Sequence, residues 1–157
     1  MGFLLAQDAI SGKDGAAYAT INGEVKEMFY IKKFKAEVEK KKSELKVVGT
    51  RTVQHKAKEL VYTGTMTIYD VTSDFVNLMS QYDKDGVDTY FTIQIVNDDP
   101  TSTIGIKRTA LYNVNLDKLP IAQLDADSDY LEAEVGFTFS GFEELDAFIT
   151  PAKLGGN

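Results

Sequence analysis

The side chains that most often carry out catalysis are scarce in this chain of 157 residues. It contains no cysteine and one histidine, His55, which excludes thiol nucleophiles, cysteine-ligated metals and three-histidine zinc sites. His55 lies in a polar, basic stretch, and no nucleophile motif such as GxSxG accompanies it. Residues 12–15 lack the spacing of a phosphate-binding loop. We therefore expect no enzymatic activity, no catalytic residue and no cofactor.

Carboxylates are more plentiful, and one cluster of them has the spacing that opens a calcium-binding EF-hand loop. Asp125, Asp127 and Asp129 would be its first, third and fifth positions. The loop then requires glycine at its sixth position and glutamate at its twelfth, where this chain has Tyr130 and Gly136. A solvated acidic turn before a strand is the better interpretation. A second acidic group is better explained as the turn that ends a helix, and no metal site is predicted (Asp83, Asp85, Asp88).

The charge is distributed unevenly along the chain. The net charge is −7, but residues 40–58 hold seven basic side chains and one acidic side chain, a local charge of +6 that leaves −13 for the rest. Residues 117–146 hold nine acidic side chains and one basic one. Such polarity suits either a charged ligand or copies of the chain that bind head to tail.

The basic segment, residues 40–59, is expected to be a long loop. Loops of this length are uncommon unless they are functional or disordered. Val47 and Val48 beside Gly49 resemble the tip of a β-hairpin that contacts protein. A nucleic-acid-binding β-barrel that uses residues 40–58 is the alternative, although no aromatic side chain is available there for base stacking. A surface loop without a function is the third possibility.

Alternation of apolar and polar residues is the dominant structural signal, and it predicts strands with one buried face. In residues 110–116 the expected buried face consists of Ala110, Tyr112, Val114 and Leu116. Residues 17–21 and 25–31 flank Asn22-Gly23, a strong hairpin signal. The other predicted strands are residues 34–38, 61–71, 91–95 and 131–139.

One helix interrupts the strands. Thr72 or Ser73 can cap it, Gly86 can end it, and its apolar residues have helical spacing (Phe75, Leu78, Met79 and Tyr82). The sequence therefore predicts a mainly β fold, an antiparallel β-sandwich or partly closed barrel with one packed α-helix. Residues 1–149 are expected to form a single domain, and residues 150–157 a flexible C-terminal tail.

The N-terminal apolar run is too short for a signal peptide, and no stretch approaches the roughly 18 apolar residues of a membrane span. We expect a protein made in the cytoplasm, without a membrane partner.

Several segments, in this order and spacing, resemble the XkdM-like tail tube proteins of contractile phage tails, prophage-derived particles and R-type bacteriocins. The resemblance covers roughly residues 6–142. It rests on residues 10–15 (ISGKDG), 38–44 (VEKKKSE), 64–75 (GTMTIYDVTSDF), 90–92 (YFT), 111–115 (LYNVN) and 121–128 (IAQLDADS).

The resemblance implies a structural subunit that forms hexameric rings, which stack into a hollow tube inside a sheath. Expected partners are further copies of the chain, the sheath protein, the baseplate protein that starts the tube and the terminator that ends it. DNA would be passing cargo in a phage, and the particle would assemble in the cytoplasm of the host bacterium. The long loop would reach the neighbouring ring, through Lys46, Val47, Val48, Gly49, Arg51 and Lys56.

Overall fold

The computed structural model describes residues 15–98, 100 and 105–146. The predicted tail, residues 150–157, and the predicted end of the domain at residue 149 lie outside this part of the chain. The described elements follow the order β1 (Gly15–Ile21), β2 (Glu24–Glu27), β3 (Ile31–Leu45), β4 (Gln54–Tyr69), α1 (Asp74–Asp85), β5 (Phe91–Asp98), β6 (Ile106–Lys118), β7 (Glu132–Thr138) and β8 (Gly141–Asp146).

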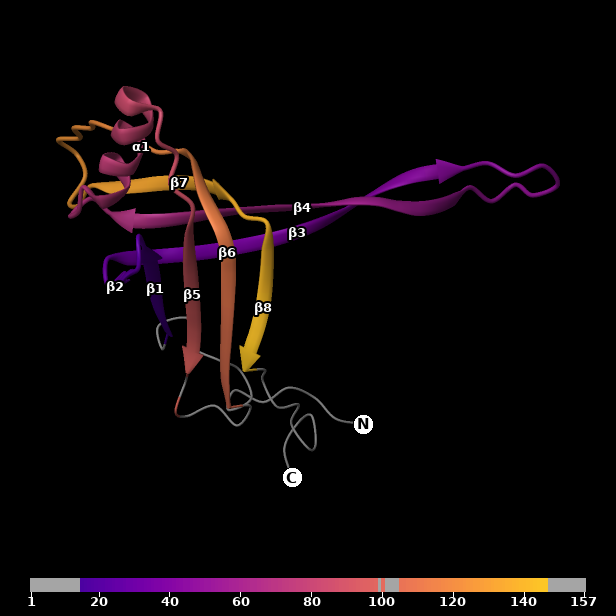
Figure 1. Cartoon of the computed structure of the whole chain (residues 1–157), viewed down its shortest axis with the longest axis horizontal. Helices are drawn as coiled ribbons and strands as arrows, with labels where there is room; N and C mark the ends of the chain where they lie inside the picture. Colours follow the sequence, from indigo (N-terminus) through magenta and orange to yellow (C-terminus); the bar gives the residue numbers. More distant parts are fainter. Residues whose placement is uncertain (1–14, 99, 101–104, 147–157) are drawn as a thin grey trace.

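The strands form one antiparallel sheet that does not close. Its order is β2-β1-β5-β6-β7-β4-β3, and β8 pairs with β6. Strand β6 connects the two halves, because its first part pairs with β5 and β8 and its last part pairs with β7. In Figure 1 the strands β1, β5, β6 and β8 run at a steep angle to β3, β4 and β7. The mainly β, antiparallel fold with one helix is confirmed.

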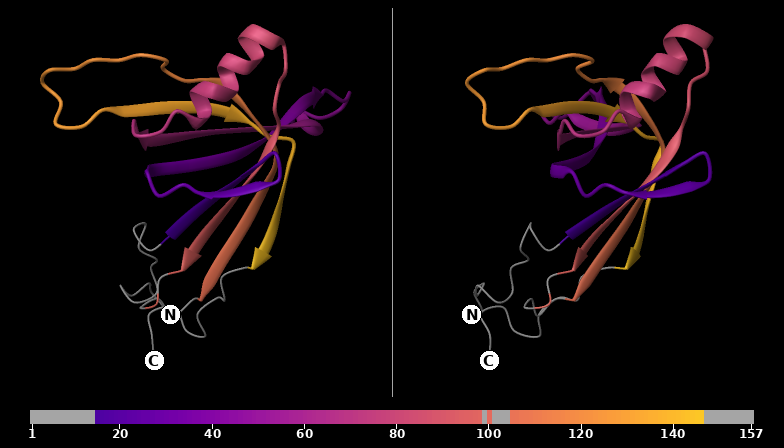
Figure 2. Two further views of the ribbon diagram at one scale, coloured as in Figure 1. Left: turned by 60° about the vertical axis from the view of Figure 1, so that its left-hand side comes forward. Right: turned by 90° about the vertical axis from the view of Figure 1, so that its left-hand side faces the viewer.

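The core fills the space between the two halves, which diverge from each other in Figure 2. Its members come from both halves and from the helix. The largest side chains among those that are fully buried are Met28, Met66, Ile93, Val114, Val135 and Phe137. Because alternate residues of each strand face this space, the alternation in the sequence identified part of the core correctly. Ala36 and Val38, on the face of residues 34–38 that was predicted to be buried, are exposed.

Helix α1 forms where it was expected and covers one end of the core. The Asp74 amide donates a hydrogen bond to Thr72 Oγ1 at 3.3 Å, while Ser73 at the N-cap position makes no side-chain cap. Phe75 is buried, with its ring centroid 6.1 Å from that of Phe91. Gly86 ends the helix with a φ of 69°, a left-handed conformation that glycine adopts without strain.

The Asn22-Gly23 hairpin is confirmed, but its second strand is shorter than expected. Both turn residues have positive φ, 52° and 80°, as a two-residue type I′ turn requires. The predicted strand over residues 25–31 is interrupted, because β2 ends at Glu27 and Met28 turns into the core. The Met28 amide donates to the Ala17 carbonyl at 2.8 Å, and the chain re-enters the sheet as β3.

Strand β6 departs from the predicted alternation. Tyr112 was expected in the core but is exposed, and Leu111 is buried in its place. The register between β5 and β6 shifts at this point, and Asn113 has a φ of 56°. A residue inserted in the left-handed conformation is typical of a β-bulge, which reverses the inward face of the strand on either side. The prediction for Tyr112 was therefore wrong, while that for Val114 was right.

The long basic loop predicted over residues 40–59 is mostly strand. β3 continues to Leu45 and β4 begins at Gln54, so the connection is only residues 46–53. The sequence concealed these strands because both faces of the ribbon are exposed and no alternation marks them. The structure also adds β8, which the sequence did not predict.

Candidate assembly surfaces

The most prominent surface is the part of the β3–β4 ribbon that projects from the body, referred to below as the hairpin (residues 39–61). It extends along the long axis of the molecule in Figure 1. β4 pairs with β7 only from Thr63 onward, so the eight residues before Tyr62 have β3 as their one neighbour. At about 3.3 Å per residue, this free part of the ribbon is roughly 25 Å long before its connecting loop is counted. An isolated two-stranded ribbon is only marginally stable in water, so the hairpin is a segment suited to contact with a partner.

The connecting loop at the end of the hairpin, residues 46–53, is called the hairpin tip. It contains five of the six residues expected to make inter-ring contacts: Lys46, Val47, Val48, Gly49 and Arg51. All five are exposed, and Val48 is fully so, at 102%. The sixth, Lys56, lies on β4 opposite Ser43. The tip therefore combines exposed apolar side chains with positive charge.

Most of the positive charge of the hairpin is uncompensated within the described chain. Lys41 is within 3.3 Å of Glu39, a neighbour on the same strand. The structure records no ion pair for the other described basic residues between positions 40 and 58 (Lys40, Lys42, Lys46, Arg51, Lys56 and Lys58). His55 faces Glu44 across the ribbon, and both are exposed.

Aromatic side chains anchor the base of the hairpin to the body. Phe34 on β3 stacks against Phe137 on β7, with ring centroids 5.5 Å apart. Tyr62 on β4 contacts Phe139 at 5.2 Å, and its carbonyl accepts a hydrogen bond from the Phe139 amide at 3.3 Å. Gly64 lies beside the Phe137 ring, where a Cβ atom would collide with the ring. This packing fixes the direction in which the hairpin leaves the body.

Three strands leave one edge unpaired within the described chain: β2, β3 and β8. The β8 edge carries the exposed apolar side chains Phe142 and Leu145. Its acidic residues are held by neighbours on β6, since Tyr112 donates to Glu143 at 2.7 Å and Arg108 lies 3.5 Å from Asp146. The hydrogen bond to Glu143 raises the pKa of Tyr112. Unpaired edges can add strands from another chain.

The β6–β7 connection, residues 119–131, is called the acidic loop. Its apolar side chains Ile121, Leu124 and Tyr130 are exposed, and it contains three aspartates and no basic residue. The Asp127 amide donates to Asp125 Oδ1 at 3.0 Å, which is the turn geometry expected of aspartate. The interpretation of this segment as an acidic turn before a strand is confirmed. Sequence reasoning missed its exposed apolar residues, which no periodic pattern marks.

Besides the ion pairs between β6 and β8, two more connect elements of the body. Lys32 donates to Glu132 Oε1 at 2.6 Å, and this hydrogen bond raises the pKa of Lys32. Lys26 lies 3.4 Å from Asp74. Burial, and then the negative charge of Asp74, raise the pKa of Tyr30 to about 12. These groups stabilise the contacts between neighbouring elements.

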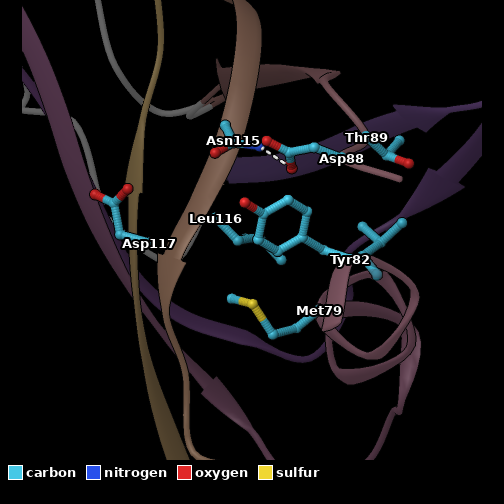
Figure 3. A pocket seen from close by; sticks show the side chains of 8 residues that line it. Met79, Tyr82, Asp88, Thr89, Asn115, Leu116 and Asp117 are labelled. Atoms are coloured by element: carbon cyan, nitrogen blue, oxygen red, sulfur yellow. Dashed lines mark hydrogen bonds between the residues drawn. The ribbon is translucent and has the colours of Figure 1, made fainter. Parts of the chain in front are cut away.

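A hollow of about 210 Å³ lies between α1 and β6, and Figure 3 shows its lining. Leu78, Met79, Tyr82 and Leu116 contribute apolar surface, and Asp88 accepts a hydrogen bond from Asn115 Nδ2 at 2.7 Å.

Across the described residues no three histidine, aspartate or glutamate side chains are grouped so that they could hold a metal ion. In the same part of the chain, no helix has the length and apolar character to cross a membrane.

Comparison with known proteins gives one consistent result. A family model described as phage tail tube protein matches residues 2–146. XkdM of the phage-like element PBSX of Bacillus subtilis (strain 168) is 51% identical over 140 residues, which cover 89% of this chain and 92% of XkdM. A chain of the anti-feeding prophage baseplate aligns with a TM-score of 0.68 at 12% identity, over 90% of this chain and 97% of its own. A chain of the sheath–tube complex of PVC, an extracellular contractile injection system, aligns with a TM-score of 0.66 at 11% identity, over 90% and 95%. The two structural alignments show a shared fold.

Proposed function

Because the chain belongs to the phage tail tube protein family, we propose that it is the non-enzymatic structural subunit of the inner tube of a contractile tail or tail-like particle. Six copies form a ring, and rings stack into a hollow tube inside a sheath. The particle assembles in the host cytoplasm, and the tube meets an initiating baseplate protein at one end and a terminator at the other. DNA passes through the tube where the particle is a phage.

The hairpin is the observation that supports this proposal most strongly. It is a ribbon with two exposed faces and exposed apolar residues at its tip, and it projects well beyond the rest of the molecule (Figure 1). Contacts within its own chain stabilise such a segment only marginally, whereas contact with a neighbouring copy would bury its apolar side chains and pair its charges. The unpaired edges of β2, β3 and β8 support lateral association in the same way, because strand addition from neighbours satisfies their backbone groups.

Electron microscopy of the purified protein over a range of concentrations tests the proposal. We expect six-fold rings in end views and striated tubes in side views. A protein that stays monomeric at high concentration, alone and with sheath and baseplate partners added, would refute it.

A charge-reversed variant tests the role of the hairpin. Arg51→Glu combined with Lys56→Glu should sharply reduce the number and length of tubes while leaving the thermal unfolding temperature unchanged, because both residues are exposed. The matched control, Lys84→Glu with Lys118→Glu, changes the net charge equally at exposed positions away from the hairpin. If the two double variants assemble equally well, the hairpin does not make the inter-ring contact.

The alternative, a nucleic-acid-binding module that uses residues 40–58, makes an opposite prediction. It requires labelled duplex DNA to be retarded at low salt, with an affinity that falls steeply as salt rises. We expect no retardation, since the hairpin has cations without aromatic side chains between them and the rest of the chain is strongly acidic.

A further inference from the structure

We propose that the acidic loop is the surface on which the hairpin tip of a second copy of this chain docks. The inference rests on the proposed function, because it names the surface that receives the hairpin within the stacked tube. The contact places Leu124, Ile121 and Tyr130 of one copy against Val47, Val48 and Val53 of the next.

The acidic loop presents apolar side chains that the described chain leaves uncovered. Leu124 is 98% exposed, Ile121 77% and Tyr130 72%. Three large apolar residues within ten positions, rimmed by aspartates, form the kind of patch that marks an interaction site. Single exposed leucines are common on protein surfaces, but here the exposed residues are gathered on one connection.

The loop is also held in a defined conformation before any partner arrives. Gln123 Nε2 donates to the Glu132 carbonyl at 2.9 Å and to Asp70 Oδ2 at 3.2 Å. The Asp70 amide donates to the Leu131 carbonyl at 2.9 Å, and the Tyr130 ring lies 6.2 Å from that of Tyr69. These contacts tie the loop to the end of β4, to Asp70 directly after it and to the start of β7. A surface ordered in advance loses less entropy when a partner binds.

The hairpin tip is complementary to this surface in two independent respects. It carries two basic residues, Lys46 and Arg51, and no acidic one, whereas the acidic loop carries three aspartates and no basic residue. It also has its own exposed apolar residues, with Val48 fully exposed. Apolar contact at the centre with opposite charges around it is the usual arrangement of a protein interface.

Geometry requires that the two surfaces meet between copies and not within one. Figure 1 shows the hairpin tip at one end of the long axis and the acidic loop, drawn in orange, at the other. Figure 2 shows the same loop extending away from the strands in both views. Complementary surfaces at opposite ends of one subunit make a head-to-tail contact, which repeats along an axis without limit. That is the contact that stacked rings need.

Crosslinking tests the contact directly, because the natural chain has no cysteine. Val48→Cys and Leu124→Cys place one thiol on each surface at exposed positions. A short bis-maleimide added to assembled tubes should convert the double variant into a ladder of covalent oligomers. A mixture of the two single variants should give dimers only. The control, Val48→Cys with Gln81→Cys on α1, should give no ladder, since Gln81 is exposed but lies on the helix.

Charge exchange provides a second readout. Asp127→Lys with Asp129→Lys leaves in place the Asp125 side chain that forms the turn, and it should raise the concentration needed for tube formation about tenfold. Lys46→Glu with Arg51→Glu should do the same. Both pairs together in one chain should restore assembly to within a few fold of the natural protein.

The outcomes separate the two proposals. If tubes form but the Val48–Leu124 variant gives no ladder and the combined charge variant is no better than either pair alone, the docking surface is wrong and the tube function stands. If the natural protein forms no tubes, the proposed function fails and the docking surface with it.

Discussion

Gly64, at the base of the hairpin, is the position where a single methyl group should have the largest effect. A Cβ atom at this residue would lie 2.5 Å from Cε2 of Phe137, closer still to Cζ, and 2.9 Å from the Lys35 carbonyl oxygen. Carbon atoms attract each other at about 3.5–4.0 Å, so the ring would have to move by about 1 Å. It has little room, because Phe137 is 1% exposed and stacks on Phe34. Gly64→Ala therefore overpacks the contact that fixes the hairpin to the body.

The magnitude follows from two opposing effects. Overpacking a core costs about 1–3 kcal/mol, and the upper end applies here because both a ring and a backbone oxygen are in the way. Replacing glycine by alanine in a strand contributes about 0.5–1 kcal/mol in the other direction, since the unfolded chain loses freedom. The net loss of about 2 kcal/mol should lower the Tm by roughly 4–8 °C for a chain of this size.

Thermal unfolding followed by circular dichroism, at a concentration too low for assembly, measures the effect. Gly141→Ala is the matched control, because a Cβ there meets nothing within 4 Å, so that only the gain from the unfolded chain remains and its Tm should rise by about 1–4 °C. Phe137→Leu should relieve the clash, so that the double variant loses less stability than the two single changes together. A Gly64→Ala protein as stable as Gly141→Ala would refute the reasoning.

Three further predictions concern Tyr30, Asn113 and the effect of salt. Tyr30 has a pKa raised to about 12 in the folded chain, so above pH 10 its phenol ionises in the unfolded chain first. The free energy of unfolding should therefore fall by about 2 kcal/mol between pH 10 and 12. Tyr30→Phe should remove this contribution to the pH dependence, as measured by denaturant titrations at each pH. Asn113 has a φ of 56°, so Asn113→Val should cost about 1–2 kcal/mol while Asn113→Gly is nearly neutral, as measured by urea unfolding. Raising the salt concentration from 0.1 to 1 M shortens the screening length from about 10 to 3 Å, which weakens attraction between charges on neighbouring copies. Light scattering should then show that the tubes become shorter. If the tube length does not change with salt, the charges of the hairpin do not contribute to assembly.

Much of the body could be predicted from the sequence because burial leaves a periodic trace. Phe91 and Ile93 alternate with polar residues, and both are buried as expected. Asn22-Gly23 predicted its hairpin because few residues tolerate positive φ at two successive positions. Gly86 predicted the end of the helix for the same conformational reason. In each case one local physical requirement restricts the residue type.

The errors occurred where that link between burial and residue type is broken. The two strand segments of the hairpin are hydrogen-bonded to each other but exposed on both faces. Their polar residues therefore show no alternation, and the segment was predicted to be a loop. At the Asn113 bulge an inserted residue shifts the alternation by one, so Leu111 is buried in the core and Tyr112, which was predicted there, is exposed. The exposure of the apolar residues of the acidic loop, such as Leu124, could not be predicted, because they do not belong to a periodic pattern that would place them on a buried or an exposed face.

By itself, the sequence determined most strands and the helix of the body, the lack of cysteine, the presence of a single histidine and the separation of charge into a basic and an acidic segment. These depend on residue type and spacing, which are local. The sequence suggested a hairpin tip at residues 47–49, but only the tertiary structure decided that β3 and β4 extend through the basic segment and project from the body, and that the hairpin tip and the acidic loop lie at opposite ends of the molecule. That arrangement depends on which strands pair and on the angle at which the two halves of the sheet meet, and both are set by packing between residues far apart in the chain.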